Sequence, residues 1–147
     1  MKEIRRSDLD KPVQEALKEV ESTLSASHCP YSGLQVAAGL LLEDGSVVTG
    51  VNYESASYGL TLCAERAALV RAQAEGSISR GVALLLAARR AGEERPGRPI
   101  TPCGACRQWI LELSARLGRE LPVYAFPAGG ESGLTDTPGN LLPDAFL

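Results

Sequence analysis

The sequence has no surplus of positive charge: 15 lysines and arginines face 18 aspartates and glutamates, which gives a net charge of -3. This balance leaves no basic excess to neutralise a string of phosphates, so we expect no long nucleic acid as ligand. The sequence also lacks an apolar run near the roughly 20 residues that span a bilayer, and residues 1–6 lack the apolar segment of a secretory signal. We therefore expect a soluble, cytoplasmic protein that does not bind membranes.

Repeats and low-complexity tracts are also absent, and a length of 147 residues suits a single domain over residues 1–147. Asp44-Gly45, between two apolar runs, is a strong hairpin signal. Gly76 and Gly118 follow two further apolar segments and are typical of helix ends. The patterns predict three helices and four strands, in chain order helix 10–25, strands 36–42 and 47–52, helix 63–75, strand 82–87, helix 102–117 and strand 121–126.

Strands separated by helices imply parallel pairing and a sheet that helices cover on both faces. The first two strands form an exception, because a tight turn can join only antiparallel neighbours. We therefore expect an α/β fold, a three-layer α-β-α sandwich around a mixed, mostly parallel five-stranded sheet with an antiparallel first hairpin, which is one strand more than the four that the patterns locate.

Four cysteines stand in the chain, and in a reducing compartment they are better explained as thiols than as disulfides. Cys103 and Cys106 lie three residues apart in the predicted first turn of a helix, with Thr101 as its cap and Pro102 in its first position. A helix N-terminus favours the thiolate form that binds zinc. Alone, this pair is equally compatible with a redox motif or with two buried core cysteines.

Cys63 changes that balance, because it also stands where a helix is predicted to begin and is followed two residues later by Glu65. Three cysteine ligands leave the fourth position of a zinc ion open, which is typical of catalytic sites, whereas structural sites close all four positions. We expect a small buried side chain at Cys29 and a surface or structural role for His28, the only histidine. Trp109, on the second of these helices, is expected in the core.

The two cysteine segments resemble the paired zinc motifs of a known enzyme family. Cys63-Ala64-Glu65-Arg66, followed by Pro102-Cys103-Gly104-Ala105-Cys106-Arg107-Gln108, is similar to the cytidine deaminase family in the three-cysteine version of its small tetrameric members. Further segments that resemble the family are residues 29–32, 50–54 and 140–146, so the likeness covers most of the chain.

The resemblance implies that Cys63, Cys103 and Cys106 hold one zinc ion per chain. Zinc lowers the pKa of a water molecule, and Glu65 takes up its proton and passes it to the cytosine ring, whose C4 is attacked by the oxygen. Arg66 corresponds to an arginine that hydrogen-bonds a zinc-bound thiolate and offsets the negative charge of three thiolates. The implied reaction converts cytidine and deoxycytidine to uridine and deoxyuridine in pyrimidine salvage, with release of ammonia.

The resemblance also assigns the substrate contacts. Asn52 and Glu54 correspond to residues that bind the ribose hydroxyls, and Ala64 to one whose backbone bonds the base edge. Leu34 stands where relatives often have phenylalanine, so the pocket is expected to be looser. Phe146 corresponds to a tail phenylalanine that enters a neighbouring subunit's site, which implies a homotetramer with shared active sites.

Two alternatives remain open at this stage. The first is a related deaminase that acts on another aminated nucleoside such as blasticidin S and shares the zinc motifs. The second belongs to another class, a noncatalytic zinc module that binds a partner. Glu54 and Phe146 favour cytidine as substrate, and a noncatalytic module has no special need for Glu65.

Overall fold

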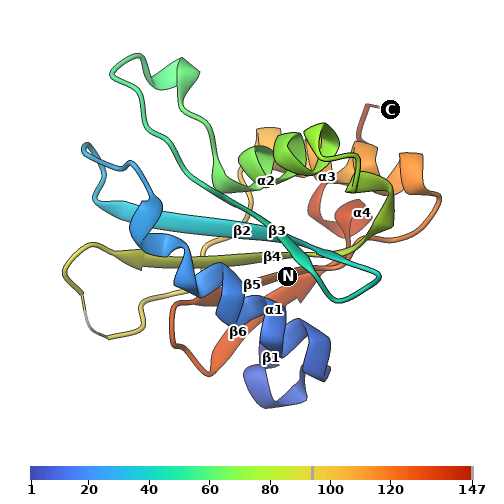
Figure 1. The fold of residues 1–147 in the computed structure, drawn as a ribbon, viewed down its shortest axis with the longest axis horizontal. Coiled ribbons are helices and arrows are strands. Elements are labelled where there is room, and N and C mark those ends of the chain that lie inside the picture. The colour runs from blue at the N-terminus through green and yellow to red at the C-terminus, as the bar shows by residue number, and fades with distance from the viewer. Residues whose placement is uncertain (94, 147) are drawn as a thin grey trace.

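The computed structural model describes residues 1–93 and 95–146, and a twisted six-stranded sheet runs through its centre (Figure 1). In the described residues the strands and longer helices are, in chain order, β1 Lys2–Arg5, α1 Lys11–Ser22, β2 Leu34–Leu42, β3 Val47–Val51, α2 Ala64–Ala74, β4 Gly81–Arg90, α3 Gly104–Leu117, β5 Val123–Pro127, β6 Ser132–Asp136 and α4 Pro138–Leu141. All three expected helices and all four expected strands are confirmed, with ends that differ by a few residues.

The sheet has the strand order β1-β6-β5-β4-β2-β3, so it contains six strands where five were expected. It is mixed, as expected, and the antiparallel hairpin of β2 and β3 is confirmed. The expectation that it is mostly parallel is wrong, because β4 and β5 form the one parallel pair among the five pairings of the described strands.

The position of β2 explains this difference. The chain passes from β3 through α2 to β4, and β3 and β4 do run in the same direction, as a helical crossover requires. However, β2 lies between them and pairs antiparallel with both. The inference from the crossover was therefore correct for chain direction and wrong for which strands are neighbours.

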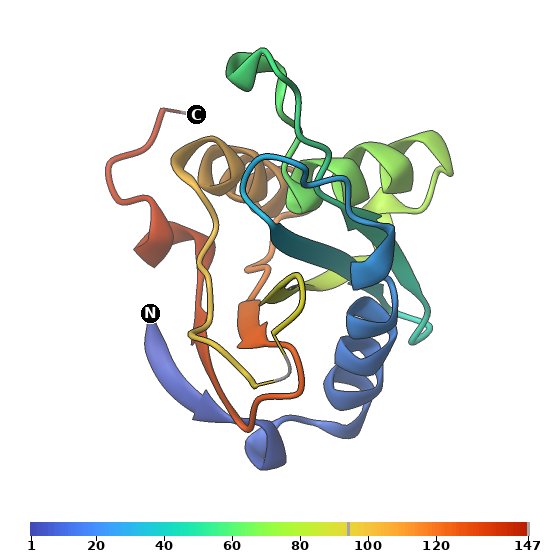
Figure 2. The same cartoon turned by 90° about the vertical axis from the view of Figure 1, so that its left-hand side faces the viewer.

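The sheet is the middle of three layers, with α1 on one face and α2 and α3 on the other (Figures 1 and 2). Alternate residues of the central strands face the two sides. Leu84 and Leu86 of β4 pack in the core beneath α2 and α3, while Leu85 packs in the core beneath α1. Because both faces are covered, β2 and β4 are apolar almost throughout.

Glycine residues end the secondary-structure elements where they were expected to. Gly118 follows α3 with a φ of 64°, and Gly76 lies just beyond α2 with a φ of 70°. Both are left-handed conformations that glycine adopts without a side-chain clash. Gly45 has a φ of 85° in the turn between β2 and β3, so the predicted hairpin turn is confirmed.

A third use of glycine brings α2 unusually close to the sheet. A Cβ atom built on Gly50 of β3 would lie 2.3 Å from the backbone nitrogen of Ala68 and 2.9 Å from the carbonyl oxygen of Ala64. The backbone of α2 thus rests directly on β3, and this contact fixes the height of the helix above the sheet.

No helix in the described part of the chain is both long and apolar enough to cross a membrane.

Candidate active site

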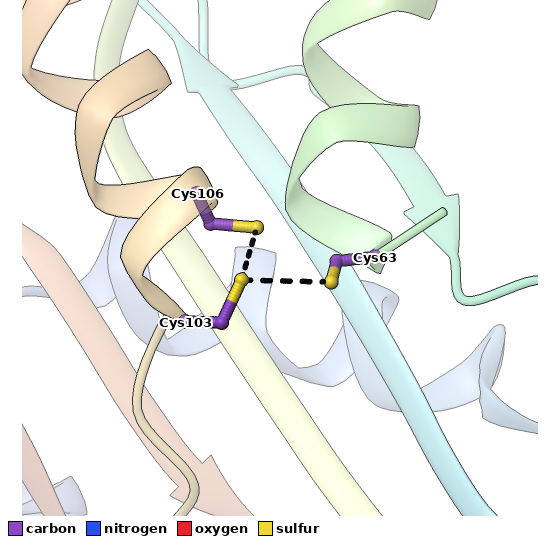
Figure 3. A group of neighbouring side chains, drawn as sticks. All are labelled: Cys63, Cys103 and Cys106. Atoms are coloured by element: carbon purple, nitrogen blue, oxygen red, sulfur yellow. Dashed lines mark hydrogen bonds between the residues drawn. The ribbon is translucent and has the colours of Figure 1, made fainter. Parts of the chain in front are cut away.

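Three cysteine sulfur atoms meet between the first turns of α2 and α3 (Figure 3). The Sγ atoms of Cys63 and Cys103 lie 3.8 Å apart, and those of Cys103 and Cys106 lie 3.5 Å apart. All three sulfurs lie within 4.8 Å of one another. Tetrahedral zinc with bonds of about 2.3 Å requires sulfur atoms separated by roughly 3.8 Å, so the donor set fits a zinc ion.

The helix ends place these ligands. Cys63 is the N-cap residue of α2, and Cys103 is the N-cap residue of α3. The expectation that α3 begins earlier, with Thr101 as its cap and Pro102 in its first turn, is wrong, because the helix starts at Gly104. Both ligand groups nevertheless lie at positive helix ends, where the peptide dipoles stabilise thiolates.

Hydrogen bonding among the thiols is uneven. A hydrogen bond from Cys106, helped by Arg66, lowers the pKa of Cys63 to about 5 against the opposing effect of burial. The same bond and burial raise the pKa of Cys106. Of this coupled pair, Cys63 is the thiol that its surroundings favour as a thiolate, and Cys106 is the one that keeps its proton.

Glu65 lies in the first turn of α2 beside the sulfurs, and only 4% of its surface is exposed. Burial raises the pKa of its carboxyl group, and the negative charge of Cys63 adds to this effect. A carboxyl group in such surroundings takes up a proton more readily than one in water. Its place next to the three sulfurs suits it to exchange protons with a molecule held there.

Arg66 reaches back over the start of its own helix. Its Nη2 atom lies 3.8 Å from Cys63 Sγ and donates a hydrogen bond of 3.1 Å to the carbonyl oxygen of Thr61. Its Nε atom is buried and has no hydrogen-bond partner among the described residues. The cation therefore stands directly beside one of the three ligands.

A cavity of about 400 Å³ opens beside Glu54, in the loop that follows β3. The Glu54 carboxylate accepts hydrogen bonds from the Tyr31 backbone, at 2.9 Å, and from the backbone and hydroxyl of Ser32. These bonds, chiefly that from the Ser32 hydroxyl, lower the pKa of Glu54. The cavity is lined by Tyr31, Ser32, Glu54, Tyr58 and Thr61.

Sequence reasoning gave no role to the residues around Glu54 that line this cavity. Tyr31 and Ser32 stood in a segment that resembled the family, but a hydrogen bond over 22 positions leaves no local sequence pattern. Tyr31 and Tyr58 meet edge to face at 6.0 Å between ring centres. The two loops that carry them thereby form one rim.

Asn52 and Leu34 lie where β3 and β2 meet. The Asn52 side chain is buried; its Oδ1 accepts from the Val36 backbone at 2.9 Å, and its Nδ2 donates to the Leu34 carbonyl at 3.0 Å. Leu34 is partly buried against the core beneath α2 and α3, while Ala64 is fully buried. Asn52 therefore fixes the start of β2.

The remaining candidates lie outside the sulfur cluster. His28 stacks on Tyr53 with 4.5 Å between ring centres, and Cys29 is a partly buried free thiol outside the group of possible metal ligands. The expectation that Trp109 belongs to the core is wrong: 42% of it is exposed, because it points outward from α3 into a groove with α2. Phe146 is 88% exposed near the chain end.

An α/β sandwich in which three grouped thiols stand beside a buried carboxyl is typical of the class of zinc-dependent deaminases. The family model described as "Cytidine and deoxycytidylate deaminase zinc-binding region" matches residues 10–117. The chain belongs to this family, whose matched region is described as zinc-binding, and one zinc ion per chain agrees with it; Cys63, Cys103 and Cys106 are the residues grouped closely enough to hold that ion.

Individual relatives agree with this assignment. A cytidine deaminase of Halalkalibacterium halodurans is 45% identical over 133 residues, which cover 90% of this chain and 92% of the relative. One from Mycobacterium tuberculosis is 40% identical over 128 residues, covering 83% of this chain and 80% of the relative. The crystal structure of a cytidine deaminase from Burkholderia pseudomallei superposes with a TM-score of 0.76 at 36% identity, covering 90% of this chain and 97% of that one.

Proposed function

We propose that this protein deaminates cytidine and deoxycytidine to uridine and deoxyuridine, with release of ammonia, as a step of pyrimidine salvage. The observation that carries the proposal is the buried carboxyl of Glu65 beside three sulfurs arranged for zinc. The relatives described above are named cytidine deaminase, and they match most of this chain's length. Their similarity supports cytidine as the substrate.

Zinc, when bound, supplies an electrophile that makes water a nucleophile near neutral pH. Glu65 accepts a proton from the water, because burial raises the proton affinity of its carboxyl group. It then donates that proton to ring N3 as the oxygen adds to C4. It takes the second proton from that oxygen and passes it to the amino group on C4, so that the carbon–nitrogen bond breaks and ammonia leaves as the C4 carbonyl forms. One carboxyl group therefore acts as base and as acid, and proton uptake and release balance over the cycle.

Arg66 supports this chemistry through charge. Three thiolates on a divalent cation leave a formal charge of -1, which weakens the cation's attraction for electrons. The guanidinium beside Cys63 Sγ opposes that charge, together with the N-termini of α2 and α3. We assign Arg66 as the residue that keeps the ion electrophilic.

The cavity beside Glu54 is proposed to take the sugar. The Glu54 carboxylate can accept hydrogen bonds from the sugar, from the two vicinal hydroxyl groups of cytidine or from the single ring hydroxyl of deoxycytidine, and Asn52 lies two residues earlier, directly after β3. The backbone of Ala64, next to Cys63, is proposed to bond the base edge. Leu34, at the start of β2, is proposed to cover the face of the ring with aliphatic surface.

We propose a homotetramer in which Phe146 completes the site of a neighbouring chain. The Phe146 ring is exposed while its carbonyl is held by Gln108, so the ring is presented outward. An apolar groove of about 450 Å³ between α2 and α3, with Trp109 and Val70 at its surface, offers area for contact between chains. The cytoplasm is the proposed compartment, because its reducing conditions preserve thiol ligands.

Ultraviolet absorbance with a panel of cytidine, deoxycytidine, cytosine and blasticidin S tests the reaction. We expect turnover of both nucleosides by the wild-type protein and none by Glu65→Ala protein that retains zinc. Glu75→Ala, which removes an exposed carboxylate at the other end of α2, serves as the matched control.

The alternatives predict different results from the same panel. Preferred turnover of blasticidin S would establish the related deaminase, and no turnover of any compound by the zinc-loaded wild-type protein would favour a binding module. Full cytidine turnover by Glu65→Ala protein would contradict the assigned role of Glu65.

A further inference from the structure

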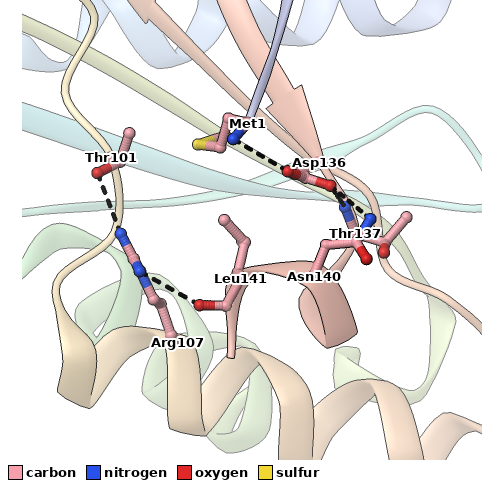
Figure 4. A network of polar contacts seen from close by, with 7 residues as sticks. All are labelled: Met1, Thr101, Arg107, Asp136, Thr137, Asn140 and Leu141. Atoms are coloured by element: carbon pink, nitrogen blue, oxygen red, sulfur yellow. Dashed lines mark hydrogen bonds and ion pairs between the residues drawn. The ribbon is translucent and has the colours of Figure 1, made fainter. Parts of the chain in front are cut away.

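Arg107 directly follows the ligand Cys106 on α3, and its guanidinium contacts two segments outside that helix (Figure 4). Its Nε donates to the carbonyl of Pro102 at 2.8 Å, and its Nη1 donates to the carbonyl of Leu141 at 3.2 Å. Its Nη2 lies 3.4 Å from the hydroxyl oxygen of Thr101. Each of the three nitrogen atoms thus holds a different acceptor.

Two of these acceptors belong to the segment that leads into the ligand Cys103. Thr101 and Pro102 lie outside any helix or strand, so the regular hydrogen bonds of secondary structure do not fix their position. The Pro102 carbonyl is part of the peptide unit that joins it to Cys103. Holding this carbonyl therefore holds the backbone from which the Cys103 side chain extends.

The third acceptor belongs to the C-terminal segment, residues 138–146. Leu141 is buried against the core beneath α2 and α3, and α4 packs on α3. Further along, Gln108 Nε2 donates to the Phe146 carbonyl at 2.7 Å. Two consecutive side chains after Cys106, Arg107 and Gln108, therefore attach this segment at two places, the end of α4 and the last described residue.

We propose that Arg107 is a positioning residue that couples the C-terminal segment to zinc retention. One guanidinium bonds the Pro102 and Leu141 carbonyls at once, so the docked segment helps to hold Cys103 in its metal-binding place. This role concerns how long zinc stays bound and is separate from the contact of Phe146 with substrate. The release of zinc is measured without any nucleoside, so its outcome does not depend on the proposed reaction.

The contacts set the expected size of the effect. Residues that orient metal ligands typically change metal affinity about tenfold to a hundredfold when they are lost. Arg107→Gln removes most of the donors. Arg107→Lys keeps the charge but offers one ammonium group in place of a planar fork, so it cannot satisfy three separated acceptors together. We expect zinc release to be fastest in Arg107→Gln, intermediate in Arg107→Lys and slowest in the wild type.

The test follows the transfer of zinc from the holoenzyme to an excess of a chromogenic chelator. Arg107→Gln is expected to release zinc at least tenfold faster than the wild type, and so is a chain that lacks residues 141–147. Combining the two changes should be no faster than the faster single change, because both break the same link. Arg71→Gln, an exposed arginine on α2 that pairs with Glu75, should release zinc at the wild-type rate.

A second measurement separates positioning from a general loss of stability. Amide hydrogen exchange of Arg107→Gln should rise in residues 101–103 and 138–146 and stay unchanged in α1 and β4. Wild-type release rates in Arg107→Gln, or in the shortened chain, would overturn the proposal. So would effects that multiply in the combined variant. If Arg107→Gln does not fold, Arg107→Lys and the shortened chain carry the same comparison.

Discussion

At the scale of single residues, the fourth cysteine of the chain serves as a control for the three whose sulfur atoms are grouped. Cys63, Cys103 and Cys106 lie within 4.8 Å of one another, whereas Cys29 lies outside the group and is partly buried. We predict that Cys103→Ala loses zinc together with activity, because two thiolates and water bind zinc far less tightly than three thiolates. Cys29→Ala should keep one zinc per chain. Elemental analysis checks both, and full zinc in Cys103→Ala would exclude the site.

A second prediction at this scale concerns Arg66. We expect Arg66→Gln to keep the fold and most of its zinc but to turn over substrate roughly tenfold to a hundredfold more slowly, the range typical of groups that support metal ligands. The physical reason is that the charge beside Cys63 Sγ is no longer opposed. The rate constant at saturating substrate and zinc is the measurement. A value equal to the wild type would reduce Arg66 to a capping contact with Thr61.

At the scale of elements, the contact between β3 and α2 determines the position of the site residues at the start of α2, Cys63 and Glu65. We predict that Gly50→Ala destabilises the protein and lowers its activity, since the new methyl group would overlap the α2 backbone, which cannot yield as a flexible side chain does. Overpacking of this kind typically costs about 1–3 kcal/mol. Thermal unfolding and turnover are the measurements.

Gly59→Ala is the matched control for that prediction, because nothing lies within 4 Å of the atom it adds and its φ is not positive. It should unfold at the wild-type temperature. Equal stability of the two variants would mean that α2 can move away from the sheet without loss.

The elements also show which parts of the fold were predictable. The strands β2 and β4 were found because both of their faces are buried and their sequences are apolar. The strands β1 and β6 were missed because they lie at or next to an edge of the sheet and carry mostly polar, exposed or half-buried residues. Such strands give no apolar pattern, so six strands could not be counted from the sequence.

Within the site, the grouping of the three cysteines was predictable because Cys103 and Cys106 are close in sequence and Cys63 starts the other helix. The contact of Arg107 with the C-terminal segment could not be predicted, because Arg107 and Leu141 lie 34 positions apart in the sequence. Trp109 was misplaced for a related reason, because neighbouring apolar residues do not reveal which side of α3 faces the sheet. Spacing predicts local geometry, whereas packing between distant segments depends on the whole fold.

At the scale of the whole molecule, the proposed sharing of sites between chains makes a distinctive prediction. When Glu65→Ala chains are mixed with Phe146→Ala chains under conditions that exchange subunits, activity should exceed the sum of the two separate proteins. Random mixing of equal amounts gives roughly a quarter of the sites both intact groups if the ring acts on a neighbour.

The same experiment can also contradict the proposal that sites are shared between chains. If Phe146 acts within its own chain, every site in the mixed assemblies lacks one group and no activity returns. Each variant mixed with itself is the control for the exchange procedure. Sedimentation of the mixture must show assemblies of four chains for the comparison to hold, and a monomer in solution would refute the shared site directly.

The separation of the ligands along the chain gives zinc a second effect, on the unfolded state. Cys63 and Cys103 are 40 positions apart, and β4, in the interior of the sheet, lies between them. An ion that stays on both sulfurs in the unfolded chain closes a loop there, and in the chain-entropy treatment of cross-links a loop of this length disfavours the unfolded state by about 4 kcal/mol. An ion that is released on unfolding stabilises the native state by mass action instead. Because zinc binds the native arrangement, the melting temperature should rise with the concentration of free zinc. The metal that makes the chemistry possible thus also acts as a reversible cross-link around the central strand.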